Sequence, residues 1–445
     1  MTVVLPSTAV RLLALTARAQ KEGRAPSLLA GVVRDGGLAW STARGAVPEP
    51  HEDVQYRLGS ITKTVTAIAV LRLRDEGRLD LDDDFEQHVP GTPLGGRTVG
   101  QLLAHVAGAG AEGPSQWWER TPGTTLEGLG LTSADVPLAA GRRFHYSNLG
   151  FGLLGELLSR QRGRPWADVV RDEVLLPLGM TRTTTRPVPP AAQGYAVHPW
   201  ADLLLDEPEH DAVAMAPAGQ LWATLTDLAR FASFLLGDTG DVLSAGTLEE
   251  MTEPAGVDVS REPWSAYGLG MQVVLAGGAK LIGHGGSMPG FLAGVFVDRA
   301  EQVGAVTLSN GTTFGRDIVG DLLGTVRELE PRVVDPWVPA ASYDEQAMSL
   351  VGPWYWGPTA VAVRLDAEGL LHLAGLSGAA RTARFRRLED GTWIGLDGYY
   401  TGELLRPTAG GNSFRVATFV FTREPYGPAG AVPGGVDEAG WHPRA

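Results

Sequence analysis

The stretch YRLGSITKTVTAIAV, residues 56–70, indicates the fold class, because it begins a long apolar helix with a serine and a lysine three positions apart. Apolar residues recur at helical spacing from Ser60 to Gly77, where a glycine ends the pattern. Residues three apart share one helix face, so the Ser60 hydroxyl and the Lys63 amine can form a hydrogen bond. Taken alone, the stretch allows two interpretations. Ser60 is either a helix cap with a solvated lysine behind it, or a nucleophile with Lys63 as its base.

Two further stretches carry motifs that favour the nucleophile. GRRFHYSNLGFGLLG, residues 141–155, holds Tyr146 and Asn148 two positions apart just before a predicted helix. LIGHGGSMPGF, residues 281–291, holds His284 before two glycines on a predicted strand. Ser-x-x-Lys, Tyr-x-Asn and His-Gly-Gly in this order resemble the serine β-lactamase and penicillin-binding-protein superfamily. The Tyr motif is most similar to that of class C β-lactamases and their esterase, D-aminopeptidase and D,D-carboxypeptidase relatives.

Three other stretches extend the resemblance over about residues 20–325. QLLAHVAG is similar to the superfamily's Leu-Leu-x-His-Thr-Ser-Gly segment, with Ala107 in the place of the serine. LLPLGMTRT resembles its Pro-Leu-Gly-Met turn, and PAGQLWATLTDLARFASFLL resembles its Gly-Gly-x-x-Ser-x-x-Asp-Leu helix.

The resemblance implies a role for each residue of the first two motifs. Ser60 is the expected nucleophile that forms an acyl-enzyme, and Lys63 lowers the barrier to its deprotonation. Tyr146 is expected to be the general base in acylation and the general acid toward the leaving group, with its pKa lowered by Lys63. Asn148 is expected to hold Lys63 or a substrate amide by hydrogen bonds.

The third motif departs from the penicillin-recognising members, many of which carry lysine at the position of His284. A histidine is mostly neutral near pH 7, which weakens a β-lactamase assignment, and His284 could instead hydrogen-bond Tyr146. Gly285 and Gly286 are expected to bind substrate, although a strand bulge is the alternative. The backbone N–H groups of Ser60 and Ser287 are the expected oxyanion hole.

Aromatic residues and one arginine are candidates for substrate contacts. Trp117, Trp118 and Trp222 could line a pocket that shields the acyl-enzyme from water, with simple packing an equal alternative. Arg423, near the C-terminus, could bind a substrate carboxylate or form a structural ion pair. His105 and His145 flank the motifs and are expected to pack or to support them.

The order of predicted elements favours an α+β fold. A helix and a Gly-Gly hairpin lie within residues 1–45, helices follow at 98–108, 149–161 and 224–236, and strands return between 268 and 311. These elements predict a β-lactamase-like antiparallel sheet, built from both ends of the domain and flanked by helices, with an all-helical subregion.

We predict a domain boundary in the proline-rich stretch near residue 330. The catalytic domain is expected at 1–330, a linker at 331–345, and a small all-β lipocalin-like barrel at 346–445, where short alternating strands are separated by glycine turns.

Composition excludes several functions. The formal charge of −14 argues against nucleic-acid and anionic-membrane partners, and the absence of cysteine excludes disulfides and thiolate sites. No histidine pair has zinc spacing, so neither a metal nor another cofactor is expected. The chain has no basic leader and no apolar run long enough to span a membrane, so a cytoplasmic protein is expected.

Two functions within the superfamily remain open. The favoured one is a cytoplasmic thioesterase that takes a nonribosomal peptidyl thioester, delivered by a carrier protein, onto Ser60 and releases it by head-to-tail macrocyclisation. The resemblance to penicillin-binding-protein-type thioesterases suggests this, because they pair the same domain with a lipocalin-like barrel. The alternative is an esterase or a D-aminopeptidase or D,D-carboxypeptidase-like hydrolase that uses water as the acceptor of a peptide or acyl-ester substrate.

Two hypotheses outside the superfamily fit the sequence less well. An α/β-hydrolase would need Gly-x-Ser-x-Gly, which the chain lacks. A binding or sensor module would be expected to have lost Ser60, Lys63 or Tyr146, and all three are present.

Overall fold

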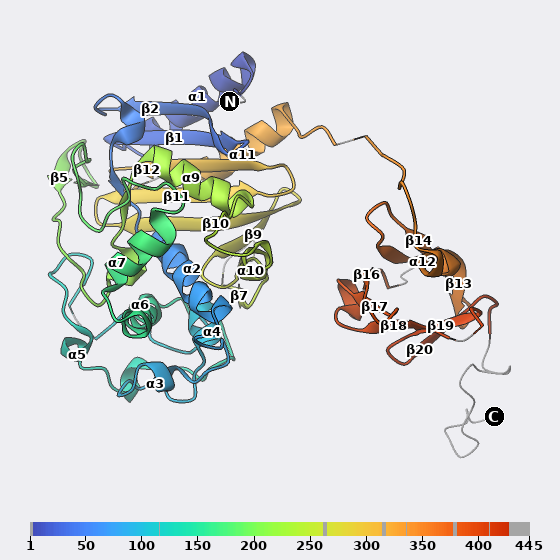
Figure 1. The fold of residues 1–445 in the computed structure, drawn as a ribbon. Coiled ribbons are helices and arrows are strands. Elements are labelled where there is room, and N and C mark those ends of the chain that lie inside the picture. The colour runs from blue at the N-terminus through green and yellow to red at the C-terminus, as the bar shows by residue number, and fades with distance from the viewer. Residues whose placement is uncertain are drawn as a thin grey trace, which may run out of the picture. The chain divides into compact units, whose positions relative to one another are not determined.

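The computed structural model describes residues 3–114, 116–260, 265–313, 317–334, 336–376, 381–408 and 410–426. The chain divides into two compact units between Val333 and Val334 (Figure 1). Each unit has a hydrophobic core of its own.

The first unit is built on an eight-stranded antiparallel sheet in the order β2-β1-β12-β11-β10-β9-β8-β7. Both ends of the unit contribute to the sheet, because β1 pairs with β2 on one side and with β12 on the other. This confirms the predicted hairpin and closing strands. The strands are β1 (Ser27–Arg34), β2 (Gly37–Gly45), β7 (Gly256–Asp258), β8 (Ser265–Tyr267), β9 (Gln272–Ala276), β10 (Ala279–Met288), β11 (Phe291–Asp298) and β12 (Val303–Ser309).

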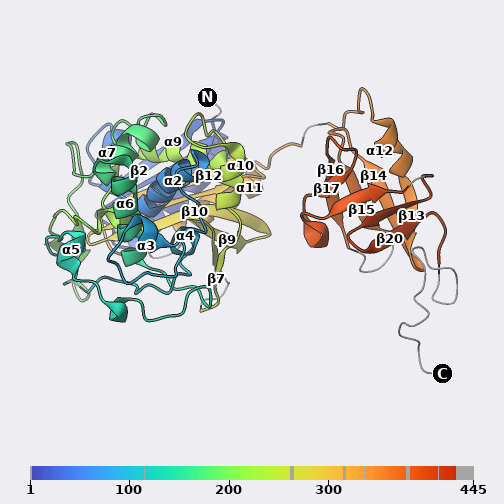
Figure 2. The same ribbon diagram turned by 60° about the horizontal axis from the view of Figure 1, so that its bottom comes forward.

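Helices cover both faces of this sheet, as Figures 1 and 2 show. The helices α1 (Pro6–Glu22) and α11 (Ile318–Leu329) contact each other and share one core with β1 and β12. The helix α9 (Leu225–Leu236) packs against β1, β11 and β12 in the other core, which also holds the central helix α2 (Ile61–Asp75). Every residue of α2 from Ile61 to Leu71 is buried.

A largely helical region surrounds the far end of α2. Its helix α6 begins at the cap Ser147, whose hydroxyl accepts a hydrogen bond from the Gly150 N–H, and ends before a left-handed Gly163. The predicted helix at 98–108 is shorter than expected, since it stops before His105, which has a φ of +58°. The region comprises α3 (Phe85–His88), α4 (Val99–Leu103), α5 (Leu126–Leu129), α6 (Asn148–Arg162), α7 (Trp166–Val170), α8 (Ala216–Gly219) and α10 (Ala245–Met251), with a π-helical turn at Arg171–Leu175 and a 3-10 turn at Ser133–Asp135. A further 3-10 turn, His51–Asp53, contacts α9 and β2.

Two short antiparallel ribbons complete the first unit. One pairs β3 (Tyr56–Arg57) with β6 (Trp222–Ala223), and the other pairs β4 (Tyr195–Val197) with β5 (Leu204–Asp206). The β3–β6 ribbon leads directly into α2, so it positions the start of that helix.

The second unit is a closed barrel of eight antiparallel strands preceded by α12 (Glu345–Leu350). Inward-facing aromatic residues, among them Trp354, Phe385 and Phe414, fill its core. The structure confirms the predicted all-β barrel. The strands are β13 (Gly352–Trp356), β14 (Thr359–Leu365), β15 (Leu371–Gly375), β16 (Ala383–Arg387), β17 (Trp393–Gly395), β18 (Leu404–Pro407), β19 (Ser413–Val416) and β20 (Phe419–Thr422), with a 3-10 turn at Gly398–Tyr400.

Among the residues described, no helix combines the length and the apolar character that crossing a bilayer requires.

Candidate active site

The start of α2 brings the serine and the lysine of the first motif together. Lys63 Nζ donates hydrogen bonds to Ser60 Oγ at 3.0 Å and to the carbonyl oxygen of Ala218 at 2.7 Å. Lys63 is fully buried, and this burial lowers its pKa to about 7, although the negative charges of Glu112 and Glu119 partly oppose the change. Near neutral pH, the amine can therefore accept a proton from the serine.

Ser60 does not act as a helix cap. It stands at the N-cap position of α2 with helical dihedral angles, φ −62° and ψ −11°, and its side chain accepts no capping hydrogen bond. Its hydroxyl is therefore directed to Lys63, and Lys63 itself is not solvated. Of the two interpretations that the sequence left open, the geometry favours a nucleophile with its base.

Tyr146 lies beside this pair, but its pKa differs from the expectation. Burial raises the pKa of the phenol above its ordinary value, and the hydrogen bond to Ser60 offsets this only in part. The prediction that this pKa is lowered was wrong, because the loss of hydration on burial is the largest effect on the phenol and the charges of Glu112 and Glu119 act in the same direction. The Lys63 amine lies over the face of the Tyr146 ring, with Nζ 5.0 Å from the ring centre.

His105 supports Tyr146 from behind. The centres of the two rings are 4.3 Å apart, and His105 Nδ1 accepts a hydrogen bond from the backbone N–H of Ser147 at 3.0 Å. Burial holds the pKa of His105 well below its ordinary value, so the ring stays neutral. His105 therefore fixes the loop that carries the second motif, as expected for a supporting residue.

Asn148 was expected to hold Lys63 or a substrate amide. Its side-chain amide instead donates to Glu112 Oε1 at 2.6 Å, and Glu112 Oε2 accepts from Trp118 Nε1 at 2.6 Å. Asn148 thereby helps to orient a carboxylate whose charge acts on Lys63.

His284 is neutral, but its partner is not the one expected. Its Nε2 atom is 2.9 Å from the hydroxyl of Tyr267, whereas the rings of His284 and Tyr146 are 6.2 Å apart. The suggested bond to Tyr146 is therefore replaced by one to Tyr267. The Nδ1–H group donates to the Gly285 carbonyl, so Nε2 accepts from the phenol. Burial, with a contribution from the charge of Lys63, lowers the pKa of His284 to about 3, so this position provides no positive charge.

The backbones that carry the expected oxyanion-hole residues, Ser60 and Ser287, pack closely against each other. Gly59 has a φ of +55°, and a Cβ atom there would lie 2.5 Å from the backbone nitrogen of Ser287. A Cβ atom at Gly286 would overlap the carbonyl oxygen of Leu58. Both glycines thus allow the backbone of β10 at Gly286 and Ser287 to pack against residues 58–60 at the start of α2. Gly285 was expected to bind substrate, but its N–H donates to Gln272 Oε1 at 3.2 Å.

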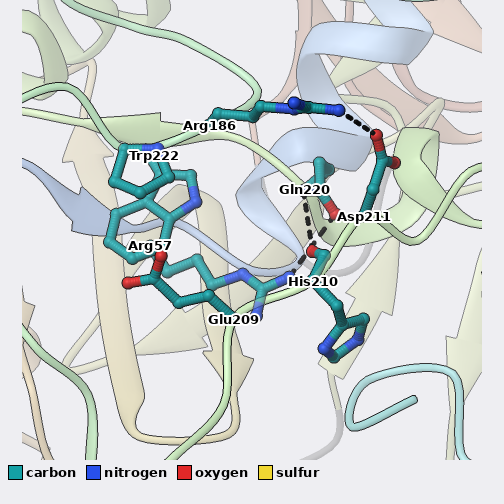
Figure 3. Close-up of a pocket in the computed structure, with 8 residues that line it drawn as sticks. Arg57, Arg186, Glu209, His210, Asp211, Gln220 and Trp222 are labelled. Atoms are coloured by element: carbon teal, nitrogen blue, oxygen red, sulfur yellow. Dashed lines mark hydrogen bonds and ion pairs between the residues drawn. The ribbon is translucent and has the colours of Figure 1, made fainter. Parts of the chain in front are cut away.

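The three tryptophans lie in different surroundings. Trp118 is buried near Ser60, since a Cβ atom at Gly219 would lie 3.3 Å from its ring and 3.8 Å from the backbone of Gly59. Trp117 is 57% exposed and donates to Glu119. Trp222 is fully buried on β6 and lines a cavity of about 340 Å³ (Figure 3). The structure thus places Trp118 and Trp222, but not Trp117, at enclosed positions.

Arg423 belongs to the barrel, where its guanidinium is already occupied. It donates to the carbonyl oxygens of Ser349, Val351 and Pro353, and it lies 3.7 Å from the centre of the Trp354 ring. These contacts account for Arg423 within its own unit, through carbonyl groups rather than a carboxylate.

Three residues that contact the candidate active-site side chains were not identified from the sequence. Tyr267 lies in a Ser-Ala-Tyr-Gly stretch that matches no motif, and Ala218 acts through its backbone carbonyl, which leaves no side-chain signal. Glu112 lies 36 positions before Asn148 in the sequence, and this spacing gave no indication of their contact. Within the described part of the chain, no group of three His, Asp or Glu side chains could hold a metal ion.

Residues 12–324 match the beta-lactamase family, and residues 343–423 match a domain of unknown function, DUF7586. Beta-lactamase-like protein 2 of Dictyostelium discoideum is 26% identical over 53% of this chain, which spans about half, 47%, of that protein's length. Penicillin-binding protein 4 of Amycolatopsis lactamdurans is 26% identical over 68% of this chain and 88% of that protein. Esterase EstB of Burkholderia gladioli is 32% identical over 39% of this chain and 50% of that protein.

Solved structures share the fold at low sequence identity. The octameric penicillin-binding protein homologue from Pyrococcus abyssi has a TM-score of 0.64 and 21% identity, and covers 93% of this chain and 99% of its own. The D-amino acid amidase from Ochrobactrum anthropi SV3 has a TM-score of 0.62 and 22% identity, over 72% and 98% of the two chains. The structure of SurE with D-Leu has a TM-score of 0.56 and 24% identity, over 94% and 100%.

The match to the family extends over most of the first unit and includes Ser60, Lys63, Tyr146 and His284. The chain therefore belongs to the beta-lactamase family, within the superfamily of beta-lactamase and penicillin-binding-protein-like serine hydrolases.

Proposed function

We propose that the protein transfers the acyl group of a peptidyl thioester or ester to Ser60 and releases it by attack of an amine of the same peptide, which closes a ring. The observation that carries this proposal is the hydrogen bond between Ser60 and a buried Lys63 whose pKa is lowered to about 7. Neutral Lys63 accepts the serine proton as Oγ attacks the carbonyl carbon. The N–H groups of Ser60 and Ser287 receive the negative charge on the carbonyl oxygen.

Tyr146 completes the acylation step as a proton donor. Its raised pKa keeps the phenol protonated near neutral pH, and its hydrogen bond with Ser60 places it beside the reacting oxygen. Tyr146 donates its proton to the leaving thiolate or alkoxide. The proton that Lys63 took from Ser60 then restores the Tyr146 phenol through the same hydrogen bonds. In deacylation the steps run in reverse, with an amine in place of the leaving group.

The charges around the site support an amine as acceptor. Glu112 is held in place by Asn148 and Trp118, and the charges of Glu112 and Glu119 both act on Lys63. Such carboxylates attract the ammonium end of a peptide, which can then lose its proton to the neutral amine of Lys63 and attack. His284 carries no charge, so this position does not demand a substrate carboxylate.

The proposal includes a partner and a compartment. A carrier protein that holds the peptide as a thioester would deliver it, and such carriers operate in the cytoplasm. A D-residue at the end of the acyl group is part of the proposal, and the SurE structure with D-Leu, which covers both units, supports it.

Hydrolysis by water is the second candidate. The relatives named esterase and D-amino acid amidase favour it, and the acylation step is the same. The two candidates differ only in the group that attacks the acyl-enzyme.

Mass spectrometry of enzyme and products tests the proposal. The substrate is a peptidyl thioester with a free amino terminus and a D-residue at its carboxyl end, and its control is the same thioester with an acetylated amine. We expect an adduct on Ser60, its loss in Ser60→Ala, and a product lighter than the linear acid by one water. Linear acid from both substrates would establish hydrolysis instead, and turnover by Ser60→Ala would refute the acyl-enzyme.

A further inference from the structure

A cavity of about 340 Å³ lies beside the β3–β6 ribbon and is not used by the chemistry described above. Arg57 of β3, Trp222 of β6 and Gln220 line it, and Figure 3 shows these side chains together with acidic residues of the 209–211 segment. The cavity therefore combines an aromatic wall with several polar groups.

Arg57 is buried at this cavity without a counter-ion. The residue is 1% exposed, its Nε atom has no hydrogen-bond partner, and Nη2 makes one long contact of 3.4 Å with Gln220 Oε1. The guanidinium carbon lies 6.0 Å from the centre of the Trp222 ring. Among the described residues no carboxylate forms an ion pair with it. Burial lowers the pKa of Arg57 to about 10, which still leaves it protonated at neutral pH. A buried, charged guanidinium with free donors is unfavourable unless a ligand supplies an acceptor.

A second atom at the cavity also lacks a partner. His210 Nε2 is 2.7 Å from the carbonyl oxygen of Trp118, so Nε2 carries the proton and Nδ1 is an acceptor. That Nδ1 atom is buried without a hydrogen bond. Arg57 thus offers donors for a carboxylate, and His210 offers an acceptor for an N–H. An amino-acid residue with a carboxylate presents both a carboxylate and an N–H.

The acidic residues near the cavity do not cancel this positive charge. Asp211 pairs with Arg186 at 3.3 Å, and Glu209 is exposed and makes no ion pair with Arg57 within the described residues. The charges of Glu209 and of Glu119 act on Arg57 only at longer range. A ligand carboxylate that enters the cavity can therefore form the direct contacts that these acids do not.

The cavity adjoins the catalytic residues through the backbone. Arg57 lies three positions before Ser60, and the Leu58 N–H donates to the Leu221 carbonyl at 2.7 Å. Ala218, which accepts from Lys63, lies two positions before Gln220. The segments that carry Ser60 and the carbonyl partner of Lys63 therefore also carry Arg57 and Gln220 of the cavity wall.

We propose that this cavity is a substrate subsite that binds a carboxylate-bearing amino-acid residue, with Arg57 receiving the carboxylate and His210 the adjacent N–H. As a substrate subsite, it rests on the proposed acyl transfer. The carboxylate can belong to the acyl group or to the leaving group, and the experiment separates these sources.

Binding can be measured without turnover in the Ser60→Ala protein by calorimetry. The probes are N-acetyl-D-alanine and N-acetyl-D-alaninamide, which differ only in the carboxylate. We expect the acid to bind at least tenfold more tightly, and the preference to disappear in Ser60→Ala/Arg57→Gln and to return in part in Ser60→Ala/Arg57→Lys. Arg44→Gln, which removes an exposed arginine from β2, is the matched control and should keep the preference.

Equal binding of the two probes by the Ser60→Ala protein would overturn the proposal, and this comparison does not depend on the folding of any Arg57 variant. A preference that survives Arg57→Gln in a folded protein would also overturn it.

The source of the carboxylate is then identified with thioesters that carry glutamate or glutamine in the acyl group or in the leaving group. A selective loss of kcat/KM in Arg57→Gln for one glutamate substrate locates the carboxylate, and equal losses for glutamate and glutamine contradict the subsite. Failure to form a Ser60 adduct would refute the acyl transfer but leaves the binding result unaffected.

Discussion

The rate of acylation should depend on pH through Lys63. With a pKa of about 7, roughly one-tenth of the Lys63 amines are neutral at pH 6 and roughly nine-tenths at pH 8. Only the neutral amine can accept the serine proton, so activity falls as the pH decreases. We therefore expect the single-turnover rate of Ser60 acylation to rise about tenfold from pH 6 to pH 8 and to reach a plateau above that.

Replacement of Glu112 by glutamine tests the origin of this pKa. The charge of Glu112 raises the pKa of Lys63, so Glu112→Gln should move the ascending limb of the pH–rate profile to lower pH. Glu127→Gln, which removes an exposed carboxylate from α5, is the matched control and should leave the limb in place. Rapid-quench mass spectrometry of the Ser60 adduct between about pH 5 and pH 9 measures the rates directly.

If the acylation rate rises only near pH 10 or above, Lys63 with a pKa of about 7 is not the proton acceptor. Such a profile would indicate that the proton acceptor is the Tyr146 phenolate or an unperturbed lysine. A limb that stays in place in Glu112→Gln would show that this carboxylate does not influence Lys63.

Three further predictions concern stability and the third motif. The folded-state pKa of Lys63 lies below that of free lysine, so between about pH 7 and pH 10 the unfolded chain binds the extra proton and wild-type stability rises by up to about 1.4 kcal/mol per pH unit. The unfolding free energy of Lys63→Met, relative to the wild type, should therefore fall over that window in urea titrations. Gly286→Ala should lower stability by roughly 2–4 kcal/mol, as measured by thermal unfolding, and abolish Ser60 adducts, because the new Cβ would overlap the Leu58 carbonyl. Tyr267→Phe should destabilise the fold by roughly 1–3 kcal/mol in urea, since it leaves the buried Nε2 of His284 without a donor, and an unchanged midpoint would contradict that bond.

Sequence analysis was most informative where the chemistry is local. Ser60 and Lys63 are three positions apart on one helix, so their contact follows from helix geometry alone. The hairpin of β1 and β2 could likewise be predicted, because its glycine turn and its apolar strands are adjacent in the chain.

Partners that are distant in the chain could not be predicted in this way. His284 bonds Tyr267 rather than Tyr146, because β8 and β10 both pair with β9, a register that no motif encodes. Asn148 bonds Glu112, which lies in a loop whose path depends on tertiary packing. Arg57 belongs to the quoted stretch itself, but its lack of a counter-ion is visible only in the folded chain.

Burial explains both the wrong prediction for the pKa of Tyr146 and the lowered pKa of Lys63. Removal from water disfavours the charged form of any group, so it lowers the pKa of an amine and raises that of a phenol. The sequence-based prediction for Tyr146 considered only the attraction between a lysine cation and the tyrosine anion, which lowers the pKa of a phenol. In the buried site both groups are neutral near pH 7, so the amine can accept the serine proton and the phenol can donate one. One physical effect, burial, thus shifts the two pKa values in opposite directions, which supports the proposed roles of Lys63 as proton acceptor and of Tyr146 as proton donor.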